Sequence, residues 1–220
     1  MKRLKIVAFG DSLTAGVAVP KDENNWTDIL ANELDAEVIN SGIGGNTSAQ
    51  GLARIQKDVI SHMPDAVLIC FGMNDHVITS EDGRCKVSEA DFCRNITEIV
   101  TRVRDIGSKP ILITPNAVIE EYYFRRHPRE WYGSVGGANA QLAKYCELIQ
   151  EIASATSVPV VDIFNSSSKQ ELRELLRTPE HGKMADGVHP YGNGISFYAN
   201  AIITILKEAL SFANGQAKNS

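Results

Sequence analysis

Residues 4–17 read LKIVAFGDSLTAGV, a short apolar run that stops at a glycine and turns at once into small polar residues. The first half, Leu4–Phe9, has no clean polar alternation, which is typical of a strand buried on both faces. The second half places Ser12 directly after that strand. A serine in this position could cap a helix, hold a phosphate group or act as a nucleophile.

The same alternation of strand and helix continues along the whole chain. Five short runs rich in Val and Ile are predicted as strands, and longer segments with helical periodicity separate and follow them. The predicted strands are Leu4–Phe9, Glu37–Asn40, Ala66–Phe71, Pro110–Thr114 and Val158–Ile163, and the predicted helices are Trp26–Leu34, Ala49–Ser61, Ser88–Ile106, Ala138–Ala155 and Gly194–Phe212. This order predicts a three-layer α/β fold with a parallel sheet. We expect one domain over residues 1–212 and a polar tail over 213–220.

Composition narrows the classes of function. The 220 residues are 43% hydrophobic and 22% charged, which is ordinary for a globular protein with a full core. The net charge of -5 argues against a nucleic-acid partner. No apolar stretch approaches the roughly eighteen residues of a membrane span, so we expect no stable membrane insertion. The N-terminal apolar run is too short for a secretory signal, and we expect a cytoplasmic protein.

Metal and cofactor sites are not indicated. The four cysteines form no C-x-x-C pair, and no Cys/His cluster has the spacing of a zinc site. Two phosphate-binding motifs are also incomplete. The P-loop pattern would need a lysine where Val17 stands, and the third glycine of a dinucleotide fingerprint that begins at Gly42 is replaced by Thr47. We therefore expect no metal and no cofactor.

A nucleophile needs a general base, and the base needs an orienting group. His189 has a carboxylate three residues before it, in the run Asp186-Gly187-Val188-His189-Pro190. The glycine allows a tight turn, in which Asp186 could accept a hydrogen bond from the imidazole Nδ1–H. The Nε2 atom of His189 would then be free to take the proton of Ser12.

An attacked carbonyl develops negative charge on its oxygen, and hydrogen-bond donors must already point there. In open parallel sheets such donors lie at the carboxyl ends of the strands. The candidates are the N–H of Ser12, a glycine N–H after the second strand and the side-chain amide of Asn74 after the third. Among the glycines we prefer Gly45 over Gly42 and Gly44.

The chain resembles the GDSL, or SGNH, hydrolases. The resemblance rests on four blocks in the same order and with similar spacing: Gly10-Asp11-Ser12-Leu13, a glycine in the second loop, Gly72-x-Asn74-Asp75 and Asp186-x-x-His189. It implies a flavodoxin-like sheet with strand order 2-1-3-4-5. It also implies a triad of Ser12, His189 and Asp186, with an oxyanion hole formed by Ser12, Gly45 and Asn74. Asp11 is assigned a structural role in the turn.

An α/β-hydrolase is disfavoured, because no serine stands in a G-x-S-x-G motif. The resemblance implies a serine esterase or acylhydrolase that forms an acyl-enzyme from a small-molecule ester, with a short acyl chain as the first choice. A lysophospholipase, an acyl-thioesterase, a carbohydrate O-deacetylase and an acyltransferase remain alternatives, and a non-catalytic binding relative is the least favoured.

Residues 116–137 are rich in aromatic and arginine side chains. This segment is predicted either as a lid or specificity insertion or as an interface of a homo-oligomer, since both contain such residues. The candidate substrate-binding residues in it are Tyr122, Tyr123, Phe124 and Trp131.

Overall fold

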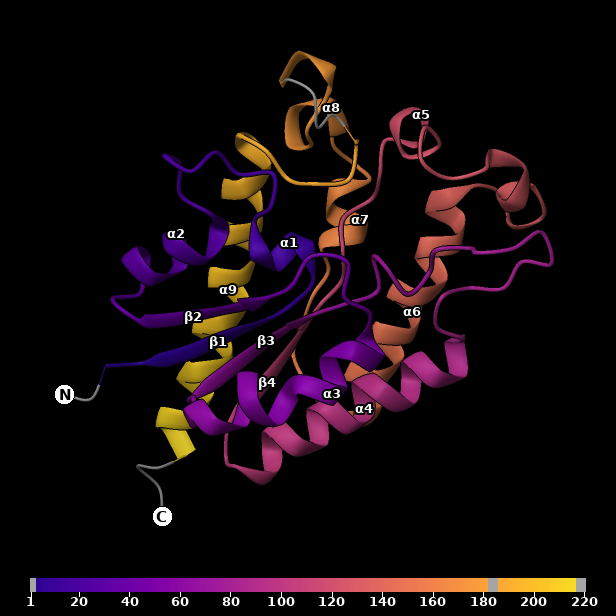
Figure 1. Ribbon diagram of the computed structural model, residues 1–220. Helices are drawn as coiled ribbons and strands as arrows, with labels where there is room; N and C mark the ends of the chain where they lie inside the picture. The colour runs from indigo at the N-terminus through magenta and orange to yellow at the C-terminus, as the bar shows by residue number, and fades with distance from the viewer. Residues whose placement is uncertain (1–2, 182–185, 217–220) are drawn as a thin grey trace.

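The computed structural model describes residues 3–181 and 186–216. In this part of the chain, five parallel strands form one sheet in the order β2-β1-β3-β4-β5 (Figure 1). The strands are β1 (Lys5–Gly10), β2 (Glu37–Gly42), β3 (Ala66–Cys70), β4 (Lys109–Ile113) and β5 (Val160–Val161). Gly10 at the end of β1 pairs with Gly42 of β2 and Cys70 of β3, so the carboxyl ends of these three strands lie side by side. The predicted fold class and strand order are confirmed.

Helices cover both faces of the sheet (Figure 1). Val7 and Phe9 of β1 point into a core shared with one group of helices, and Ile6 and Ala8 point into a core shared with the other group. The first group is α3 (Ser48–Asp58), α4 (Glu89–Asp105) and α6 (Ala138–Thr156), and the second is α2 (Trp26–Glu33) and α9 (Asn193–Gln216). Burial on both faces explains why β1 reads as a continuous apolar run.

Short helices occupy the connections. They are α1 (Ser12–Ala15), α5 (Glu120–Tyr123), α7 (Ile163–Ser167) and α8 (Leu172–Leu175), together with the 3-10 helices η1 (Ile60–His62), η2 (Arg129–Val135) and η3 (Pro179–His181). A third apolar cluster joins several of these connections through Leu13, Met73, Tyr123, Tyr132 and Val188. Within the described residues, no helix combines the length and the apolar character needed to cross a membrane.

Several elements differ from the sequence prediction. Helix α3 ends at Asp58 instead of Ser61, and β2 continues to Gly42 instead of ending at Asn40. The strand β2 is only partly buried, because it lies at the edge of the sheet. The strand β5 has two residues instead of six, because Asp162 caps helix α7 and accepts a hydrogen bond from the N–H of Asn165. Helix α9 continues to Gln216, into the predicted polar tail, and residues 217–220 lie outside the described part.

Candidate active site

Ser12 stands where β1 passes directly into α1. Asp11 caps this short helix, since its Oδ1 accepts a hydrogen bond of 2.9 Å from the N–H of Leu13. Gly10 is required at the end of the strand, because a Cβ there would lie 2.5 Å from the carbonyl oxygen of Cys70. The glycine therefore lets the turn approach β3 closely and places Ser12 at the carboxyl edge of the sheet.

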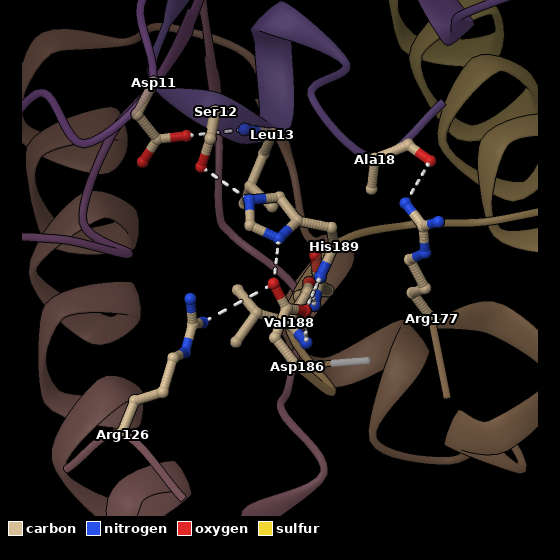
Figure 2. Close-up of polar contacts among 10 residues, drawn as sticks. Asp11, Ser12, Leu13, Ala18, Arg126, Arg177, Asp186, Val188 and His189 are labelled. Atoms are coloured by element: carbon tan, nitrogen blue, oxygen red, sulfur yellow. Dashed lines mark hydrogen bonds and ion pairs between the residues drawn. The ribbon is translucent and has the colours of Figure 1, made fainter. Parts of the chain in front are cut away.

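The structure brings Ser12, His189 and Asp186 together (Figure 2). Ser12 Oγ lies 2.8 Å from His189 Nε2, and His189 Nδ1 lies 2.6 Å from Asp186 Oδ2. Asp186 Oδ1 accepts hydrogen bonds from the N–H groups of Val188 and His189, at 2.9 and 3.2 Å. Gly187 has a φ of +65°, which favours glycine in this turn. This geometry would allow Ser12 to act as a nucleophile, His189 as its base and Asp186 as the orienting carboxylate.

Asp186 is held in its ionised form. Burial acts to raise its pKa, but the hydrogen bond and the charge of His189, with the two backbone N–H groups, lower the pKa below its usual value. Arg126 adds a cation, with its Nη2 3.4 Å from Asp186 Oδ2 (Figure 2). An ionised Asp186 favours a proton on Nδ1 of His189, which leaves the lone pair of Nε2 facing Ser12.

The glycines after β2 are not equivalent. Gly42 lies in the strand, and a Cβ on it would stand 2.2 Å from the backbone nitrogen of Ala15. Gly44 and Gly45 instead line the same cavity as Ser12. Gly45 has a φ of +78°, and among the described residues the N–H groups of Gly44 and Gly45 have no acceptor. The preference for Gly45 over Gly44 as the oxyanion donor stays a prediction.

Asn74 also lines this cavity and is held by two acceptors. Its Nδ2 donates to Asp11 Oδ2 at 3.1 Å and to the carbonyl oxygen of Asn46 at 3.0 Å. Asp11 is fully buried, and burial raises its pKa to about 7. Asp11 thus orients Asn74 in addition to capping α1, a contact between the first and third loops that the sequence does not reveal. If Asn74 donated to an oxyanion, one of its two amide hydrogens would be shared between the oxyanion and its present acceptor.

Arg54 of α3 ties the first two loops together and was not identified from the sequence. Its Nη2 donates to the carbonyl oxygen of Gly10 at 2.8 Å, and its Nε donates to Asn46 Oδ1 at 2.8 Å. The guanidinium also lies over the ring of Phe9, 4.5 Å from the ring centroid. These contacts hold the loop after β2 beside the turn that carries Ser12. An arginine in a helix carries no sequence signal for this role.

The cavity at Ser12 has a volume of about 370 Å³. Of the four candidate substrate-binding aromatic residues, only Tyr123 lines it. Tyr122 is buried and accepts a hydrogen bond from Arg173, while Phe124 and Trp131 pack against the third apolar cluster. These three residues, predicted to bind substrate, therefore do not line this cavity.

The remaining wall of the cavity combines apolar and basic side chains. Its apolar part is Val17, Met73, Val77 and Val188. Its cations are Lys86 and Arg126, and His127 lies on the wall as well, beside the catalytic candidate His189. In the described part of the chain, no group of three or more His, Cys, Asp or Glu side chains is arranged to hold a metal ion.

The chain is similar to known proteins of one family. Residues 8–194 match the model of the GDSL-like Lipase/Acylhydrolase family. The uncharacterized lipoprotein YqeF of Bacillus subtilis is 33% identical over 71% of this chain and 69% of its own length, and the arylesterase of Vibrio mimicus is 27% identical over 84% and 80%. The crystal structure of a lipase/acylhydrolase from Enterococcus faecalis superimposes with a TM-score of 0.72 at 27% identity, and the match covers 94% of this chain and 96% of that one.

Proposed function

Because the chain belongs to the GDSL-like lipase/acylhydrolase family and is a carboxylic ester hydrolase, we propose that it hydrolyses small or short-chain esters through Ser12, His189 and Asp186. The observation that carries the proposal is the continuous hydrogen-bonded path from Ser12 Oγ through the His189 ring to Asp186. A cavity of about 370 Å³ suits a small ester.

In the first half of the reaction, Ser12 Oγ attacks the ester carbonyl carbon while His189 Nε2 takes the hydroxyl proton. Asp186 stabilises the imidazolium that forms. The tetrahedral intermediate then collapses: the bond to the alcohol oxygen breaks, and His189 gives that oxygen its proton. The product is an acyl group bound to Ser12 and a free alcohol.

In the second half, His189 takes a proton from water as the water oxygen attacks the acyl carbon. Collapse of this second tetrahedral intermediate returns the proton to Ser12 Oγ and releases the carboxylic acid. In both halves the oxyanion would be bound by the N–H of Ser12, the N–H of Gly45 and the amide of Asn74. All three residues line the cavity, which supports this assignment.

The direct test of the proposed function is turnover of 4-nitrophenyl esters of increasing acyl length. Aryl esters are suitable probes, because one relative is named an arylesterase. We expect the highest kcat/KM for short acyl chains, with the carboxylic acid as product. Absence of turnover for every ester would refute ester hydrolysis by this site, and a new ester formed with added alcohol would show acyl transfer instead.

The cytoplasmic location stays a prediction, since another relative is named a lipoprotein.

Asn74→Ala is expected to lower kcat about 100-fold to 1,000-fold with a smaller change in KM, because it removes a donor that acts on the transition state. Steady-state kinetics on the best ester measures this. Asn95→Ala is the matched control: it also removes a half-buried amide, which donates to Ser48 Oγ, but Asn95 does not line the cavity. A change in KM alone for Asn74→Ala would make this residue a binding group and would contradict its role at the oxyanion.

A further inference from the structure

The charged side chains on the cavity wall all have one sign. Lys86 and Arg126 line the cavity, and no Asp or Glu is among the described residues that form its wall. The whole chain, in contrast, has 27 acidic residues against 22 Lys and Arg. A cleft with charges of one sign attracts a ligand of the opposite sign and raises its local concentration.

The two cations lie on one side of the nucleophile. Val17, Gly44 and Gly45 come from the loops after β1 and β2, whereas Lys86 comes from the segment after β3 and Arg126 from the segment after β4. Because the sheet order is β2-β1-β3-β4-β5, the two groups flank Ser12 from opposite sides. The half of the cavity toward β4 is therefore basic, and the half toward β2 is neutral.

A short hairpin presents Lys86 to the cavity. Ile78 and Cys85 form an antiparallel bridge, and the N–H of Lys86 donates to the carbonyl oxygen of Val77 at 2.9 Å. The acidic residue Asp82 at the tip of this hairpin pairs with Arg84. The hairpin thus fixes the backbone of Lys86 at the wall, while its ammonium group can reach a ligand from an exposed position.

Arg126 has N–H groups that its contact with Asp186 does not use. One of them faces Asp186 Oδ2 at 3.4 Å, but that oxygen also accepts the shorter hydrogen bond from His189 Nδ1 (Figure 2). A guanidinium has five N–H donors, and the side chain of Arg126 is 53% exposed. The ion pair with Asp186 therefore holds Arg126 in place and leaves other donors for a substrate.

His127 adds a neutral polar group to the same wall. Its ring stacks on Tyr123 at a centroid distance of 4.3 Å. Burial, together with the positive charges of Arg126 and Lys86, lowers the pKa of His127 to about 4. Lys86, Arg126 and His127 line the same cavity, so an anion bound in it would be attracted by both cations.

We propose that the ester taken by this site carries an anionic group, a carboxylate or a phosphate, and that Lys86 and Arg126 bind this group on the β4 side of Ser12. The proposal rests on the proposed ester hydrolysis and specifies its substrate class. Such a group would be attracted by both cations and would hold the ester with its carbonyl at Ser12.

Matched pairs of esters test the proposal. On the acyl side, mono(4-nitrophenyl) glutarate is compared with 4-nitrophenyl pentanoate. On the alcohol side, 4-acetoxybenzoate and 4-acetoxyphenyl phosphate are each compared with 4-acetoxybenzamide. The measured quantity is the ratio of kcat/KM for the anionic ester to kcat/KM for its neutral partner, after subtraction of spontaneous hydrolysis. We expect a ratio of about 10 or more in at least one pair.

Lys86→Gln is expected to lower that ratio about fivefold to tenfold, because it removes one of two cations. Arg84→Gln is the matched control, since it removes one charge from the same hairpin but outside the cavity wall, and it should leave the ratio unchanged. Arg126 is not used for the test, because it also contacts Asp186.

Two results would overturn the proposal while ester hydrolysis stands. One is turnover of the neutral esters with a ratio of one or less in every pair. The other is an equal loss on the charged and neutral members in Lys86→Gln. Absence of turnover for all esters, charged and neutral, would instead refute the proposed function, and this inference with it.

Discussion

Ser12→Ala is expected to reduce kcat for ester hydrolysis by about a millionfold, to the rate left by binding and oxyanion contacts alone. The reason is chemical, because alanine has no oxygen that can form the acyl-enzyme. The fold should persist, since the one hydrogen bond that the Ser12 hydroxyl makes within the described residues is that to His189. We expect the free energy of unfolding to change by less than about 1.5 kcal/mol. Burst kinetics, steady-state kinetics and urea unfolding measure these effects.

The control for Ser12→Ala is Ser61→Ala. Ser61 is exposed, donates to the carbonyl oxygen of Lys57 and does not line the cavity, so its replacement should leave kcat unchanged. Turnover within tenfold of the wild type in a well-folded Ser12→Ala protein would show that another group attacks the ester.

His189→Ala should cost nearly as much as Ser12→Ala, because Ser12 then has no base to take its proton. The double variant should be no slower than either single variant, since the two residues act as one unit. The thermodynamic cycle of four proteins on one ester measures this coupling. His62→Ala is the control, because His62 ends the 3-10 helix η1 and does not line the cavity. Additive losses in the double variant would mean that His189 acts independently of Ser12.

The fold was largely predictable, because its central strands carry apolar side chains on both faces. β1 and β3 read as continuous hydrophobic runs and were placed within one residue of their observed ends. The termination of β5 was not predictable, since it depends on the hydrogen bond from the N–H of Asn165 to the side chain of Asp162. Four-residue helices such as α1 and α5 are too short to show a helical period.

The juxtaposition at the site was also anticipated in part. Asp186 and His189 are close in sequence, and a single turn brings them together, while their approach to Ser12 follows from the fold. The contact of Asp11 with Asn74 joins residues 63 positions apart and depends on strand packing rather than on a local pattern. Lys86 was missed for a related reason: Asp82-Gly83 marks a turn, but how the hairpin closed by Ile78 and Cys85 packs against the cavity depends on tertiary contacts.

The aromatic segment 116–137 shows that composition alone does not identify the residues that line the cavity. Tyr122, Phe124 and Trp131 share their chemistry with Tyr123, but only Tyr123 reaches the cavity. Its hydroxyl contacts His76 Nε2 and the hydroxyl of Tyr132, at 3.2 and 3.0 Å, which fixes its ring at the wall. Which side of a short helix faces a cavity is decided by packing, and four residues of sequence do not reveal it.

The central claim is that Ser12 Oγ is the nucleophile and that His189 activates it. It is tested most directly by covalent labelling with an alkyl fluorophosphonate, followed by intact-mass analysis and peptide mapping. Attack by Ser12 forms a P–O bond and expels fluoride, while His189 takes the hydroxyl proton. The account predicts one adduct, on Ser12, with activity lost in proportion to labelling and with much slower labelling in His189→Ala. Full turnover by enzyme labelled completely on Ser12, or loss of activity with the adduct on another residue, would contradict it.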